Sequence, residues 1–175
     1  MDAAHECSGG FRPTLAVAAA LVVAGLGCGN DSSGPGSGGL DFPSLSQALV
    51  TQYCVRGNAT VGDTKSGDVV ASDCDAAAAR PGAVGYYEVY IVKVASAANV
   101  TFDVSSNLDS YLTLLRLDSY TASSASLTIL DENDDRSSGN LDALLTYALE
   151  PNTNYVIAVG GYDYGATGTY SLAIR

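Results

Sequence analysis

Tryptophan is absent from this sequence, and histidine and methionine occur once each. The one histidine, His5, precedes an apolar segment typical of export signals. Ser-His-Asp catalysis, Cys-His catalysis and the usual zinc sites need histidine, so the chain beyond that segment lacks them. Neither Lys65 nor Lys93 lies three residues after a serine, and no Asp-Thr-Gly or Asp-Ser-Gly occurs. The common catalytic arrangements are absent, and we expect no enzyme activity.

Basic residues are also few. The chain carries 8 Lys and Arg against 19 Asp and Glu, which gives a formal net charge of −11. Nucleic-acid binding needs a basic surface that neutralises phosphates, so we expect no nucleic-acid partner. The acidic balance favours solubility and attracts cations.

One long apolar run lies near the N-terminus. Residues 14–27, "TLAVAAALVVAGLG", carry no charge, follow Arg12 and lead directly into Cys28. The run is shorter than the roughly 20 residues that cross a bilayer, so it is typical of a secretory signal.

The end of this run, "GLGC", has small residues before a cysteine, with Gly25 three positions ahead of Cys28. It resembles the lipobox of bacterial lipoproteins, although that family prefers leucine where Gly25 stands. The resemblance implies a signal peptide over residues 1–27 and lipid on Cys28, and Gly29 is compatible with outer-membrane sorting. We therefore expect an exported, lipid-anchored protein of the bacterial cell envelope, on the periplasmic or surface face of the outer membrane. Ordinary cleaved secretion and an uncleaved anchor are the alternatives.

The cysteine count supports the lipoprotein interpretation. Of the four cysteines, Cys7 falls in the signal and Cys28 would carry lipid. Cys54 and Cys74 then remain as one pair, which an oxidising compartment would join. Closing that loop of about 20 residues would stabilise the fold by roughly 3 kcal/mol. Two reduced, buried thiols are the alternative.

A tether is expected over residues 28–43. "GNDSSGPGSGG" follows Cys28 and offers no apolar side chain to bury. A flexible chain of about 12 residues reaches roughly 20 Å, enough to hold a domain just off a membrane. The rest of the chain, residues 44–175, is expected to form one folded domain.

That domain shows the two-residue periodicity of half-buried strands. Apolar residues recur at alternate positions over 90–94, 100–104, 127–129, 141–149, 155–159 and 170–174, while residues 111–117 are apolar on both faces. Turn formers separate the segments. The pattern predicts an all-β fold, an antiparallel β-sandwich or jelly roll of about eight strands, with 111–117 as a central strand. A short helix is expected within "PSLSQALVTQYC", with Ser44 as its N-cap.

Several segments occur in a recognisable order: "YYEVYIVKV", "ANVTFDVSSNLDSYLTLLRLD", "ILDENDD", "LDALLTYALEPNTNYVIAVGGYD" and "GTYSLAI". This order resembles the bacterial pre-peptidase C-terminal (PPC) domain over about residues 67–175. The resemblance implies a compact β-sandwich that serves secreted peptidases or other surface enzymes as a non-catalytic targeting or binding unit. Some relatives use calcium. The chain carries no peptidase domain, so we expect a stand-alone version on a lipid anchor.

The segment "DENDD" concentrates oxygen ligands. Asp131, Asn133 and Asp135 occupy alternate positions, and Asp142 follows at the spacing of the last ligand of a calcium loop. These four residues are a candidate Ca²⁺ site, although Arg136 stands where such a loop needs glycine. The alternative is a turn in which Asp131 and Asn133 accept hydrogen bonds from their own backbone. No cofactor is required in either case.

Tyrosine supplies most of the aromatic surface, with 11 residues. "GGYDYGATG" places Tyr162 and Tyr164 in a glycine-rich loop, where exposed rings can stack on sugar or peptide; packing across a hairpin is the alternative. Tyr155, after "PNTN", is expected to bury its ring and to bond its hydroxyl to nearby backbone.

These features favour a non-catalytic cell-envelope lipoprotein that presents a PPC-like binding or adhesion module. Its partners would be the membrane, through lipid on Cys28, and an extracellular protein or polysaccharide. An accessory or chaperone-like partner of a secreted peptidase is the alternative. A hydrolase that uses carboxylates alone, such as Glu88 with Glu150, is a third hypothesis; neighbours within one loop cannot oppose each other across a cleft as glycosidase carboxylates do.

Overall fold

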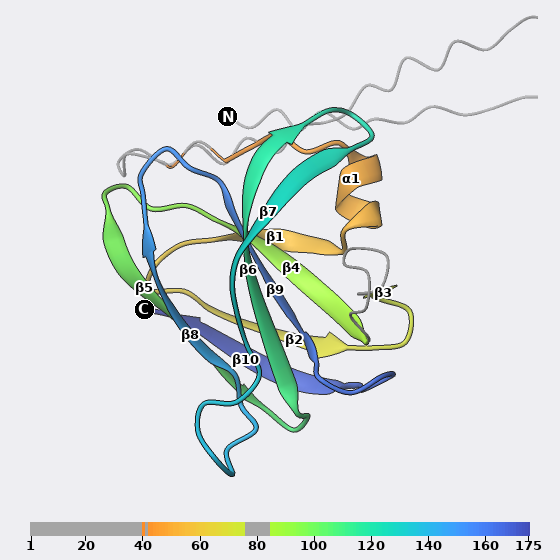
Figure 1. The fold of residues 1–175 in the computed structure, drawn as a ribbon. Helices are drawn as coiled ribbons and strands as arrows, with labels where there is room; N and C mark the ends of the chain where they lie inside the picture. Colours follow the sequence, from red (N-terminus) through yellow and green to blue (C-terminus); the bar gives the residue numbers. More distant parts are fainter. Residues whose placement is uncertain (1–39, 41, 76–84) are drawn as a thin grey trace, which may run out of the picture. The chain divides into compact units, whose positions relative to one another are not determined.

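The computed structural model describes residues 40, 42–75 and 85–175. These residues form one short helix and ten strands (Figure 1). The elements are α1 (Gln47–Gln52), β1 (Val55–Ala59), β2 (Thr64–Val69), β3 (Cys74–Asp75), β4 (Tyr86–Val92), β5 (Ala98–Ser106), β6 (Ser110–Tyr120), β7 (Ala125–Asn133), β8 (Leu144–Leu149), β9 (Tyr155–Gly161) and β10 (Gly168–Ile174). The predicted signal peptide of residues 1–27, Cys28 and most of the tether lie outside the described residues. Within the described ranges, no helix has the length and apolar character needed to span a bilayer.

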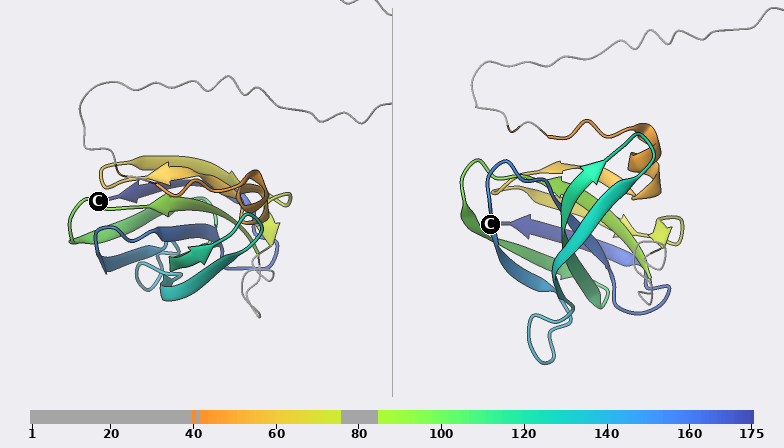
Figure 2. Two further views of the ribbon diagram at one scale, coloured as in Figure 1. Left: turned by 90° about the horizontal axis from the view of Figure 1, so that it is seen from above. Right: turned by 45° about the horizontal axis from the view of Figure 1, so that its top comes forward.

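The strands form two sheets (Figure 2). Sheet A has the order β1-β4-β9-β6-β7, with β3 also beside β4, and sheet B has the order β2-β10-β5-β8. The predicted all-β sandwich is confirmed. One pair differs from the antiparallel expectation, because β1 runs parallel to β4. A parallel pair needs a crossover connection, and the chain between β1 and β4, which includes β2 and β3, provides one.

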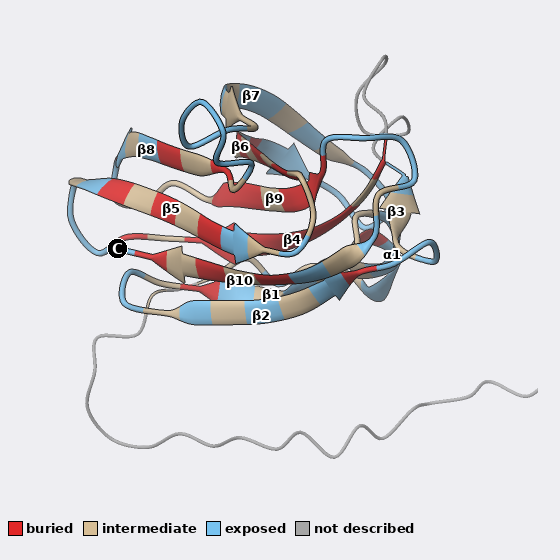
Figure 3. Cartoon of the chain, turned by 90° about the horizontal axis from the view of Figure 1, so that it is seen from below, coloured by how far each residue is buried: buried red, intermediate tan, exposed pale blue. Residues whose placement is uncertain are grey.

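The core lies between the sheets because each sheet turns an apolar face towards the other. Each strand turns alternate side chains inward, so the two-residue periodicity of the sequence becomes one buried layer (Figure 3). The largest fully buried side chains of this core are Phe102, Leu112, Leu114, Leu149, Ile157, Leu172 and Ile174. Two strands with polar sequences, "VRGNA" in β1 and "TKSGDV" in β2, lie at sheet edges, where one side needs no partner.

Two local predictions were tested by the fold. The helix begins two residues later than expected, because Ser46 rather than Ser44 is the N-cap and its Oγ accepts a bond from the Leu49 amide. This start allows Leu49 to be buried. The expectation for Tyr155 is confirmed: its ring is buried, and its hydroxyl accepts a hydrogen bond from the Glu150 amide at 2.9 Å.

Candidate functional site

The outer face of sheet A, opposite the core, is also apolar. In β4, Tyr90 and Val92 face the core, whereas Val89 and Ile91 belong to a second hydrophobic cluster. The same division explains why residues 111–117 are apolar on both faces: Leu112 and Leu114 face the core, and Leu115 and Leu117 belong to the second cluster. The central position predicted for this segment is confirmed, since β6 lies between β9 and β7.

The N-terminal part of the domain covers some of this outer face. Phe42 and Leu45 pack on the second cluster beside α1. Ser46 Oγ donates a hydrogen bond to the Ala122 carbonyl at 2.5 Å, which joins the start of α1 to the tip of the β6–β7 hairpin. Figure 1 shows this tip beside α1. The cover is incomplete, and a groove remains on the rest of the face.

We call this depression the sheet A groove. Its volume is about 420 Å³, which lies within the range of small-molecule sites. Its lining is mainly aliphatic and aromatic, with Thr113 and Asp163 as polar members. The main apolar contributors are Leu45, Leu49, Val55, Val89, Ile91, Leu115, Leu117, Leu127, Ile129 and Val156, and the tyrosines are Tyr53, Tyr86, Tyr87, Tyr111, Tyr162 and Tyr164.

The two predicted contact tyrosines lie on this groove. Tyr162 and Tyr164 follow β9 and are 50% and 80% exposed. The ring of Tyr162 lies 6.2 Å from that of Tyr111, at the start of β6. Both tyrosines therefore border the end of the groove at which β9 finishes and β6 begins, and they leave ring surface open to a ligand.

Carboxylates gather at the same end. Asp163 lines the groove between the two tyrosines, and the Asp109 carbonyl accepts a bond from the Tyr162 amide at 2.8 Å. Asp134 and Asp135 directly follow β7, whose last residue Asn133 pairs with Leu112 of β6. Burial raises the pKa of Asp109, and the charges of Asp135, Asp163 and Asp134 raise it further.

The predicted calcium ligands are not all in one turn. Asp131 and Asn133 belong to β7, and only Asp135 and Asp142 lie in the loop after it. Asp142 Oδ1 accepts bonds from the Ser106 amide at 2.8 Å and its hydroxyl at 3.0 Å, which ties this loop to β5. Across the described residues, no three His, Cys, Asp or Glu side chains are placed to hold a metal ion. The donor set does not fit a closed calcium site, and calcium binding stays a prediction.

Two aspartates of this segment accept hydrogen bonds from their own backbone, although Asp131 lies in β7 rather than in a turn. Asp131 Oδ1 accepts a bond from the Glu132 amide, and Asp134 Oδ1 accepts one from the Asp135 amide, both at 2.9 Å. Asn133 does not do the same, because its Oδ1 is buried without a hydrogen-bond partner.

An ionic network around the buried Glu88 was not predicted from the sequence. Glu88 is 3% exposed; its Oε1 lies 2.5 Å from Arg56 Nη2, and its Oε2 accepts a 2.5 Å hydrogen bond from the Tyr170 hydroxyl. Arg56 also pairs with Asp73 at 2.5 Å. Burial strongly raises the pKa of Tyr170, so its hydroxyl stays a donor at neutral pH. Glu88 is therefore buried and bonded within the domain, whereas Glu150 is exposed, so the two do not form the carboxylate pair that a hydrolase would need.

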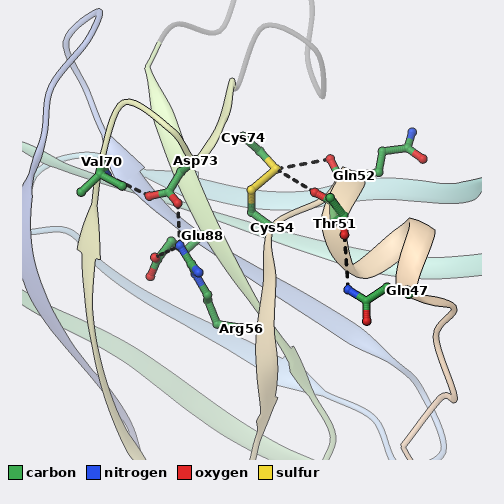
Figure 4. The surroundings of a disulfide bond; sticks show 9 residues. All are labelled: Gln47, Thr51, Gln52, Cys54, Arg56, Val70, Asp73, Cys74 and Glu88. Atoms are coloured by element: carbon green, nitrogen blue, oxygen red, sulfur yellow. Dashed lines mark hydrogen bonds and ion pairs between the residues drawn. A yellow bond between two sulfur atoms is a disulfide. The ribbon is translucent and has the colours of Figure 1, made fainter. Parts of the chain in front are cut away.

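The predicted disulfide is present. Cys54 is bonded to Cys74, with the two Cα atoms 5.7 Å apart (Figure 4). The bond joins the turn after α1 to β3, and Cys74 packs against the second hydrophobic cluster. It therefore fixes one side of the groove, next to the Arg56–Asp73–Glu88 network that Figure 4 also shows.

Comparisons with known proteins concern the fold. No family model matches the sequence, and no curated relative matches it. Among solved structures, the chain is similar to the pre-peptidase C-terminal domain of a collagenase from Bacillus anthracis, with 19% identity over 69% of this chain and 95% of that chain and a TM-score of 0.47. It is also similar to PliG of Aeromonas hydrophila, a periplasmic inhibitor of g-type lysozyme, with 13% identity over 69% of this chain and 99% of that chain and a TM-score of 0.40.

Proposed function

We propose that this chain is an exported, lipid-anchored and non-catalytic binding module that holds an apolar ligand in the sheet A groove. The observation that carries the proposal is the incomplete cover of the outer face, which leaves about 420 Å³ lined by aliphatic side chains and tyrosine rings. Sites for small molecules are concave and mostly apolar, with few polar groups that fix orientation. Thr113 and Asp163 provide such groups here.

The side chains in and near the groove support a binding role over catalysis. The described lining contains no histidine, lysine or cysteine, the side chains that most often act as nucleophile or base, and Asp163 is its one carboxylate. Glu88 is held by Arg56 and Tyr170 in the interior. The accessory role for a separate peptidase stays a prediction.

Export and lipid anchoring rest on two features of the chain. The Cys54–Cys74 disulfide is typical of an oxidising compartment. Cys28 directly follows the apolar run of residues 14–27.

We expect a Cys28→Ser variant, expressed with its own signal in a bacterial host, to move from the membrane pellet to the soluble periplasmic fraction. Immunoblots of the two fractions measure this, and equal membrane retention of variant and wild type would contradict lipid anchoring at Cys28.

Binding of a neutral fluorescent probe tests the groove. N-phenyl-1-naphthylamine is apolar and fluoresces strongly when it leaves water. We expect saturable binding to the purified chain and a loss of about tenfold in affinity in an Ile129→Lys variant, since a charge would replace apolar contact on β7. Ile129 is already 43% exposed, so this change should not unfold the domain.

Val61→Lys is the matched control. Val61 is 48% exposed and does not line the groove. Its replacement should leave probe affinity unchanged, and both variants should keep the wild-type melting temperature within a few degrees. No saturable probe binding, or equal losses in the two variants, would refute the groove as the ligand site.

A further inference from the structure

Three segments bring negative charge to one end of the sheet A groove. Asp163 lines the groove itself. Asp109 is held next to it by the 2.8 Å bond from the Tyr162 amide and by the pairing of Ser110 with Gly161. Asp134 and Asp135 join them from the end of β7, opposite the start of β6. We call these four residues the acidic end of the groove.

The acidic end is not neutralised from within. None of its four carboxylates forms an ion pair within the part of the chain that the structure describes. The carboxylates repel one another: burial makes the largest contribution to the raised pKa of Asp109, and the charges of the other three raise this pKa further. Like charges held together without a counter-ion attract a cation.

The arrangement suits an organic cation better than a bare metal ion. In the described ranges these carboxylates do not converge closely enough to coordinate a metal. A substituted ammonium group needs no such convergence, since its charge is spread over a larger volume and it does not require several oxygens within coordination distance. The exposed rings of Tyr162 and Tyr164 add faces that attract ammonium groups.

We propose, on the basis of the function proposed above, that the ligand is a small amphipathic organic amine. Its apolar body lies along Leu115, Leu127 and Val156, and its ammonium group lies at the acidic end beside Tyr162 and Asp163. The size of the ligand follows from the groove, which holds about 420 Å³ and is bounded by the Ser46–Ala122 contact opposite the acidic end. This volume accommodates a drug-sized molecule rather than a long polypeptide.

A series of ligands with one apolar body tests the charge of the head group. 4-Phenylbutylamine, 4-phenylbutanol and 4-phenylbutyrate are titrated against the full chain, by displacement of N-phenyl-1-naphthylamine and by calorimetry. We expect the amine to bind about tenfold more tightly than the alcohol, and the carboxylate more weakly than both, because several partly exposed charges together contribute that much. The preference for the amine should shrink as salt is raised from 20 to 500 mM.

An Asp134→Asn, Asp135→Asn double variant assigns the preference to the acidic end. Neither residue lines the groove, so the variant should lose most of the preference for the amine over the alcohol and leave affinity for the neutral probe unchanged. Asp68→Asn, on exposed β2 of sheet B, is the control and should keep the wild-type preference.

The outcomes separate this inference from the proposed function. If the probe binds but the three ligands bind alike, or none displaces it, the amine proposal is overturned and the groove remains a binding site. If a basic peptide binds where the amine does not, the groove serves a protein partner and the proposal is likewise overturned. If the probe itself does not bind, the proposed function fails first.

Discussion

An Arg56→Met variant is expected to lose about 2 kcal/mol of its free energy of unfolding, because it leaves the Glu88 carboxylate unpaired in the interior. Arg56 Nη2 lies 2.5 Å from Glu88 Oε1; the Glu88 side chain is only 4% exposed, whereas that of Arg56 is 45% exposed and partly screened by solvent. Tyr170 would remain as its hydrogen-bond donor at 2.5 Å, but a hydroxyl cannot balance a full charge. Urea denaturation followed by circular dichroism at pH 7 measures the loss.

Arg116→Met is the matched control for this prediction. Arg116 pairs with Asp118 at 2.6 Å and is as exposed as Arg56, but Asp118 is 30% exposed where Glu88 is 4% exposed. Loss of this surface pair should therefore change the free energy of unfolding far less. A double variant, Arg56→Met with Glu88→Leu, should recover part of the loss, since removing both charges also removes the cost of burying one alone. Similar losses in Arg56→Met and Arg116→Met would show that burial of Glu88 has no special cost.

The sequence indicates which face of its strand Glu88 occupies, but not that Glu88 bonds to Arg56 and Tyr170. Two-residue periodicity puts Glu88 in phase with Tyr90 and Val92, which face the core, and an acidic residue in that phase was a signal of a buried partner. The partners come from other strands, Arg56 from β1 and Tyr170 from β10. Periodicity within one strand carries no information on which distant strands lie beside it, so these contacts needed the tertiary structure.

The role of Gly67 also depends on contacts between strands that the sequence does not reveal. A Cβ at this position would lie 2.4 Å from Glu88 Oε2 and 2.5 Å from the Tyr170 hydroxyl. The glycine thus allows β2 to pass directly over the ionic network. In the sequence "TKSGDV" it only weakens the strand pattern, and β2 was not assigned as a separate strand.

The groove was partly visible in the sequence. "YLTLLRL" was correctly assigned to a central strand because it is apolar on both faces. The same property in "YYEVYIV" of β4 and "YVIAV" of β9 means that sheet A has a second apolar face, and such a face is either covered or available for binding. How much α1 covers depends on where the chain before β1 packs, which no local pattern reveals.

The acidic segment was misassigned in part because edge strands tolerate polar residues. "DENDD" reads as a turn by composition, yet Asp131 and Asn133 extend β7 and pair with Leu114 and Leu112 of β6. β7 is the last strand of sheet A, so one of its sides needs no neighbour, and charged residues there are common. The loop therefore begins later than predicted, and its Asp134 and Asp135 lie close enough to Asp109 to raise the pKa of that carboxyl.

Loss of the Cys54–Cys74 bond is expected to reduce stability by a similar amount. The bond closes a loop with a sequence separation of 20, and cross-links of that span restrict the unfolded chain by about 3 kcal/mol. A Cys54→Ala, Cys74→Ala variant should therefore unfold at a lower urea concentration than wild type. Wild type treated with dithiothreitol should shift to the same midpoint, whereas the variant should not respond to the reductant.

The same variant links the disulfide to the groove. Cys54 lies just after α1, and Cys74 packs against the second hydrophobic cluster on the outer face of sheet A. Removing the bond therefore releases α1, which covers one side of the groove. We expect weaker binding of N-phenyl-1-naphthylamine even at temperatures where the variant stays folded, because ordering α1 would then be part of the cost of binding. If the urea midpoint falls but probe affinity is unchanged, the disulfide stabilises the domain without shaping the site. An unchanged midpoint would contradict both roles.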